Sequence, residues 1–107
     1  MKLSEIKEKL QDTGISPGDL SQLLVVIASE YGALSEELKD ILKTKAIDWI
    51  NLRKDVKSDT QAERLWGLQT FGIREMELRL DMKSMEKMMS AIRTRLHVMG
   101  VEAMNQY

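Results

Sequence analysis

The sequence predicts an all-α protein: a helical bundle with a long C-terminal helix of coiled-coil type, which associates with copies of itself. Leu, Met, Glu, Lys and Arg are frequent, and aromatic residues make up only 5% of the chain. One proline and six glycines leave long segments uninterrupted. Near the C-terminus apolar residues recur at alternating spacings of four and three. The 107 residues suit one domain, 1–107, with a thin core.

The N-terminal half, residues 1–57, is expected to contain short helices. Leu3, Ile6 and Leu10 recur at helical spacing, and a first helix would end before Gly14. Ser16 followed by Pro17 predicts a new helix start, because Ser caps free amides and Pro is tolerated at the first helical position. Apolar residues continue to about residue 31 and again from 34 to 56. The pattern leaves open whether these two segments are one helix.

A long helix is predicted from about residue 59 to about residue 103. Ser58 and Gln61 have the spacing of a capping box, which marks its start. Gly67 and Gly72 are weak points within it. At 1.5 Å per residue this helix would be about 65 Å long, too long for short helices alone to cover. We therefore expect it to pack against residues 34–57 folded back on it, or against other copies of the chain.

The heptad spacing within this helix predicts an oligomer seam. Methionine is frequent in it, and its flexible thioether suits irregular packing surfaces. Such a stripe is usually core, and the more specific hypothesis is that this core lies between chains. The predicted seam residues are Leu78, Met82, Met85, Met89, Ile92, Leu96 and Met99.

Catalysis, metal binding and cofactor binding have no support in the sequence. His97 is the only histidine and there is no cysteine, so the clusters that bind zinc, copper or iron are missing. No Gly-rich phosphate loop and no nucleophile with a base beside it can be found. We expect a protein that is not an enzyme and has no cofactor, metal site or small-molecule substrate.

The absence of cysteine, the charged start of the chain and the short apolar runs predict a cytoplasmic protein without a membrane partner. The longest apolar run, Leu23 to Ala28, is far shorter than the roughly 20 residues that cross a bilayer. Residues 1–7 lack the apolar stretch of a signal peptide.

The positive charge is concentrated in the second half of the chain. Residues 1–50 carry six Lys or Arg and nine Asp or Glu, a balance of −3, whereas residues 51–107 carry ten and eight, a balance of +2. Acidic residues lie between these cations, which favours a solvent-exposed helix face with ion pairs. The functional alternative is a phosphate-binding face that is repeated by oligomerisation. Few aromatic residues argue against base stacking. The predicted nucleic-acid-binding residues are Arg53, Lys54, Lys57 and Arg64, with Lys83 and Lys87 as a second face.

The arrangement of helices resembles that of the recombination mediators of T-even-type phages. The similarity lies in the charged first helix, MKLSEIKEKL, in the basic pair Arg53-Lys54, and in Leu65-Trp66-Gly67-Leu68 near the start of the last helix. The resemblance implies a ring-forming helical protein that helps load a recombinase onto single-stranded DNA. We therefore expect a homo-oligomeric accessory protein of phage or bacterial DNA recombination that binds single-stranded DNA or a recombination protein weakly. The alternative is a protein-only interaction module, such as a virion structural component or an inhibitor of a host protein.

Overall fold

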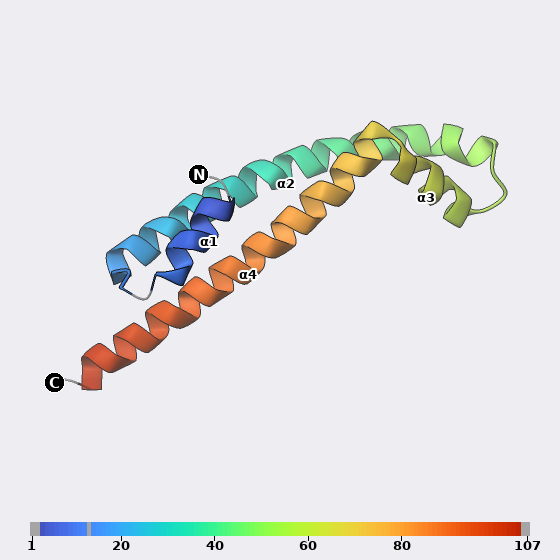
Figure 1. Cartoon of the computed structure of the whole chain (residues 1–107). Helices are drawn as coiled ribbons and strands as arrows, with labels where there is room; N and C mark the ends of the chain where they lie inside the picture. Colours follow the sequence, from blue (N-terminus) through green and yellow to red (C-terminus); the bar gives the residue numbers. More distant parts are fainter. Residues whose placement is uncertain (1–2, 13, 106–107) are drawn as a thin grey trace. The chain divides into compact units, whose positions relative to one another are not determined.

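The computed structural model is all-α, which confirms the predicted fold class (Figure 1). Its helices are α1 (Leu3–Gln11), α2 (Pro17–Lys54), α3 (Asp59–Leu68) and α4 (Thr70–Asn105). The structure describes residues 3–12 and 14–105, and side chains as far as residue 100; no strand occurs in these ranges. Contacts divide the chain into a terminal unit, residues 1–32 with 83–107, and a central unit, residues 33–82.

Helix α2 is a single helix of 38 residues, which settles the alternative that the sequence left open. It begins as predicted, because the Ser16 hydroxyl accepts a hydrogen bond from the Asp19 N–H at 3.1 Å. Gly32 does not interrupt it. A glycine inside a helix costs about 1 kcal/mol relative to alanine, which is too little to end a helix whose apolar pattern continues on both sides.

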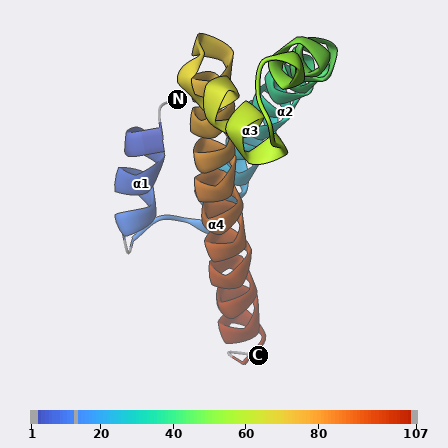
Figure 2. The same ribbon diagram turned by 90° about the vertical axis from the view of Figure 1, so that its right-hand side faces the viewer.

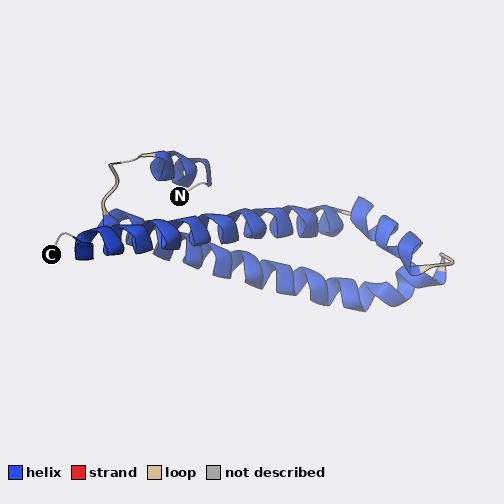
Figure 3. Cartoon of the chain, turned by 90° about the horizontal axis from the view of Figure 1, so that it is seen from below, coloured by secondary structure: helices blue, strands red, loops and turns tan. Residues whose placement is uncertain are grey.

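The single helix expected over 59–103 is instead two helices, interrupted at Gln69 (Figure 3). Its start is confirmed: the Ser58 hydroxyl accepts from the Gln61 N–H at 3.2 Å. In a capping box the Gln61 side chain would accept a hydrogen bond from the Ser58 N–H. Here it accepts from the preceding residue, the Lys57 N–H, at 3.0 Å. Gln69 has extended backbone angles, φ −82° and ψ 157°. Its N–H donates to the Trp66 carbonyl at 3.0 Å, and its own carbonyl accepts from Ile73 N–H at 2.9 Å.

The close approach of α3 and α4 at this interruption depends on Gly72. This residue is buried, and a Cβ built on it would lie 2.6 Å from the carbonyl carbon of Trp66 and 3.0 Å from Cα of Gly67. Only glycine lets the first turn of α4 meet the last turn of α3 in this way. The sequence marked Gly72 as a weak point, and the helix breaks three residues before it.

The terminal unit takes its buried residues from three helices. They are Ile6 of α1, Leu20, Leu23 and Ile27 of α2, and Met85, Met88, Met89 and Ile92 of α4. Figure 2 shows α1 alongside α4. The Arg95 guanidinium donates to the backbone carbonyls of Leu10 and Asp12, at 2.9 and 2.7 Å, and so connects α4 to the end of α1. The Tyr31 hydroxyl donates to Glu86 at 2.6 Å and connects α2 to α4.

The central unit has a core to which each of its three helices contributes. Ile41 of α2, Trp66 of α3 and Leu78 of α4 are buried, and Leu34, Leu38 and Leu52 of α2 pack against them. A bidentate pair adds to this packing: Nε and Nη2 of Arg74 each donate to a carboxylate oxygen of Glu37 at 2.8 Å. Through these hydrogen bonds Arg74 lowers the pKa of Glu37.

Candidate functional site

The loop between α2 and α3 is organised by Arg53, one of the residues predicted to bind nucleic acid. Nη1 of Arg53 donates to the Val56 carbonyl at 2.8 Å, and Nε pairs with the Asp59 carboxylate at 2.8 Å. Both contacts connect the end of α2 to the start of α3. The charge of Arg53 is therefore already matched by Asp59, and the side chain shapes this loop.

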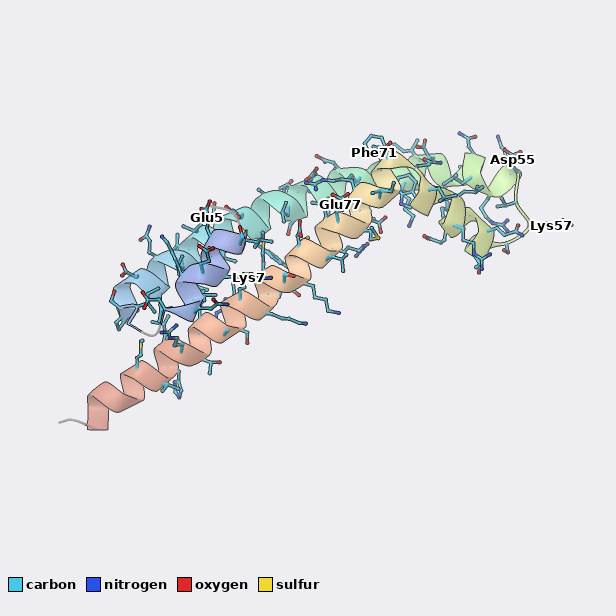
Figure 4. The ribbon with its side chains drawn as sticks, in the orientation of Figure 1. Glu5, Lys7, Asp55, Lys57, Phe71 and Glu77 are labelled. Carbon is cyan, nitrogen blue, oxygen red and sulfur yellow. The ribbon has the colours of Figure 1, made fainter. Side chains whose placement is uncertain are left out.

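Three other predicted cations are exposed at the end of α2, in the loop and in the middle of α3. Lys54, Lys57 and Arg64 are exposed, and none of them makes an ion pair with the residues that the structure describes. Figure 4 shows Lys57 in the loop after α2, preceded by Asp55. Arg64 lies two positions from each of the buried residues Ala62 and Trp66, so it is on the outer side of α3. We call Lys54, Lys57 and Arg64 the basic turn.

The second predicted face, Lys83 and Lys87, belongs to the terminal unit. Both lysines lie on α4, four residues apart and therefore on one side of the helix, and both are exposed. The structure thus assigns the two predicted sets of cations to different compact units. Arg53, Lys54, Lys57 and Arg64 belong to the central unit.

Most of the predicted oligomer seam is covered within a single chain. Leu78 and Ile92 are fully buried, Met85 and Met89 are 3% and 9% exposed, and Met82, Leu96 and Met99 are half-buried. Leu78 belongs to the core of the central unit, and Met85, Met89 and Ile92 are buried in the terminal unit. The heptad pattern therefore identified residues that pack inside the chain, and the expectation that they join copies of it stays a prediction.

A charged network beside the central core was missed by the sequence reasoning. Lys45 is 17% exposed and pairs with Glu63 at 2.9 Å and with Glu75 at 3.6 Å. Its ammonium lies 5.8 and 5.7 Å from the ring centroids of Trp49 and Trp66, within the range of cation–π attraction. These residues come from three helices and are up to 30 positions apart, so no local spacing could reveal them.

Glu75 is the most enclosed carboxylate of this network, 14% exposed. Burial opposes its ionisation, but hydrogen bonds from Arg79 at 3.0 Å and from the Trp66 indole at 3.0 Å, with the charge of Lys45, outweigh burial. The pKa of Glu75 is therefore lower than its usual value. With its charge matched on several sides, Glu75 orders the three helices and is a poor candidate for proton transfer.

The central unit carries most of the large apolar side chains that are exposed among the described residues. Of the ten large apolar side chains that are exposed among the described residues, eight lie in this unit. They are Ile47, Ile50, Leu65, Leu68, Phe71, Ile73, Met76 and Leu80, with exposed fractions from 40% to 79%. Figure 4 shows Phe71 at the start of α4. An excess of exposed apolar side chains in one unit favours contact with another macromolecule.

Among the side chains of residues 3–12 and 14–100, no three His, Cys, Asp or Glu come together in a way that could hold a metal ion. His97 is exposed on α4. No helix in residues 3–12 and 14–105 combines the length and the apolar character needed to cross a bilayer.

Comparisons with known proteins found no relative of this chain. No family model matches the chain, no curated protein is similar to it, and no solved structure resembles it.

Proposed function

We propose that this chain is an oligomeric, non-enzymatic accessory protein that binds single-stranded DNA weakly through the basic turn. The observation that carries the proposal is that Lys54, Lys57 and Arg64, which follow one another over the end of α2, the loop and α3, are exposed without ion-pair partners among the described residues. Cations in this state can neutralise phosphates without first breaking an internal pair. The resemblance of the sequence to phage recombination mediators supplies the setting, DNA recombination, and its implied protein partner, a recombination protein.

Self-association is part of this proposal because one basic turn offers few charges. Three cations make a weak site, and several copies in one assembly would bind a strand together with much higher avidity. The exposed apolar side chains of the central unit favour such contacts. Native mass spectrometry of the chain at micromolar concentration measures its oligomeric state. A well-folded monomer would contradict the proposed self-association.

DNA binding is tested by fluorescence anisotropy with a labelled single-stranded oligonucleotide at low salt. Changing Lys54 and Lys57 to Glu should weaken binding by about tenfold or more. The matched control changes Lys39 and Lys43 to Glu, two exposed lysines of the same unit outside the basic turn. Because both variants change the net charge equally, a difference between them reports the site and not the total charge.

The salt dependence gives a second, quantitative readout. For single strands the logarithm of affinity falls with the logarithm of salt concentration by about 0.7 per neutralised phosphate, so three cations predict a slope near −2 for each chain that contacts the strand. The Lys54 and Lys57 variant should have a slope near −0.7 for each contacting chain. Equal loss in both variants would refute the assignment to the basic turn. No binding by the unmodified protein at high micromolar concentration would refute DNA binding altogether.

The second candidate function is a protein-only interaction module, such as a virion component or an inhibitor of a host protein. The concentration of exposed apolar side chains in the central unit favours it, because phosphates gain nothing from apolar contacts. Failure of the oligonucleotide experiment, together with an intact helical fold, would leave this candidate in place of the first.

A further inference from the structure

The central unit contains a shallow groove with an apolar floor. Leu38, Leu42 and Ala46 of α2 and Met82 of α4 line it. Leu42 and Ala46 also line a neighbouring hollow that reaches Trp49. The floor residues of α2 thus stand at positions 38, 42, 46 and 49, on one side of the helix. At 1.5 Å per residue, this floor is about 16 Å long, which matches roughly three turns of another helix.

The rim of this groove is positively charged. Lys39 and Lys43 line it, and both are exposed without an ion-pair partner in the described part of the chain. None of the described residues lining the main groove carries a carboxylate. In the neighbouring hollow Lys45 and Glu63 face each other at 2.9 Å, so their charges cancel. The groove therefore combines apolar contact with two uncompensated cations at one end.

From this combination we infer that the groove binds an acidic amphipathic helix of a partner protein. An apolar groove of this length can accept an amphipathic helix. The bound helix would place the apolar side chains at its positions i, i+4 and i+7 or i+8 on the groove floor. The lysines select Glu or Asp beside that apolar stripe, since unlike charges across a rim favour the right partner and disfavour the wrong one. DNA fits less well, because the apolar floor offers its phosphates no contact. This inference does not depend on the basic turn.

The test uses two synthetic helical peptides of about 15 residues, long enough to cover the groove. Both have Leu at i, i+4, i+7 and i+11; one has Glu beside this stripe, and the other has Lys at the same positions. Fluorescence anisotropy should show that the unmodified protein binds the Glu peptide at least about tenfold more tightly than the Lys peptide. Changing Lys39 and Lys43 to Glu should reverse this preference.

Two further variants locate the site. Ala46 is exposed on the groove floor, so Ala46→Glu should keep the fold and reduce binding of the Glu peptide about tenfold or more. The variant with Lys54 and Lys57 changed to Glu should bind the Glu peptide as the unmodified protein does. Each pair of lysines thus serves as the control for the other, and DNA binding and helix binding can fail separately.

Three outcomes would overturn the inference. The first is no binding of the Glu peptide at high micromolar concentration, and the second is equal binding of the two peptides. The third is a homodimer of the unmodified protein that dissociates when Lys39 and Lys43 are changed to Glu, because the groove would then hold a second copy of this chain.

Discussion

Replacing Gly72 with alanine should destabilise the central unit, although alanine is the better helix former. The new methyl group would lie 2.6 Å from the carbonyl carbon of Trp66 and 3.0 Å from Cα of Gly67. Overpacking costs about 1–3 kcal/mol, and here the upper end applies because backbone atoms cannot rotate aside as a side chain can. Subtracting a gain of about 1 kcal/mol in helix propensity leaves a net loss of about 2 kcal/mol.

Two other glycines provide controls in which the sign is opposite. Gly32 in α2 and Gly67 in α3 have no described atom other than their own helix backbone within 4 Å of a new Cβ. At these positions alanine should stabilise the protein by up to about 1 kcal/mol. Thermal unfolding followed by circular dichroism should show melting temperatures higher by up to about 4–8 °C for the controls and about 8–16 °C lower for Gly72→Ala.

If Gly72→Ala melts at or above the temperature of the unmodified protein, the close approach of α3 and α4 does not exist, and the interruption at Gln69 loses its physical explanation. If Gly67→Ala also destabilises the protein strongly, the effect is a general property of glycines in this region and not of one contact.

The remaining predictions concern Glu75 and Ser58. The pKa of Glu75 is lower in the folded protein than its usual value of 4.5, so its contribution to stability is present above that pH and is lost as the pH falls through the folded pKa. Urea unfolding at neutral and at acid pH measures how much free energy of unfolding each variant loses on acidification. This loss should be smaller for Glu75→Gln than for the exposed control Glu36→Gln; equal losses would contradict the lowered pKa of Glu75. Ser58→Ala removes the hydroxyl that caps α3 and should cost about 1 kcal/mol in the free energy of unfolding, whereas Ser29→Ala on the exposed side of α2 should cost nothing; a neutral Ser58→Ala would refute the cap.

The local signals in the sequence identified helices and two of their starting points correctly. Ser16 before Pro17 and Ser58 before Gln61 each accept a hydrogen bond from the amide three residues further on, so the spacing of neighbouring residues is enough to predict them. The heptad pattern likewise predicted that Leu78, Met85, Met89 and Ile92 avoid water. An apolar stripe identifies the side of a helix that is buried, and it does not say which segment covers it.

Contacts between different helices account for what the sequence left open. Gly32 and Gly72 look alike in the sequence, yet the first lies in open space inside a continuous helix, and the second lets two helices meet at a break. The basic turn could be proposed from neighbouring cations, but the pairing of Arg53 with Asp59 separates a structural cation from three available ones. Lys45, Glu75 and Trp66 gather only when three helices pack, as do the groove of α2 and α4 and its two lysines. Each of these features depends on how one helix meets another, which the spacing of residues along a single helix does not encode.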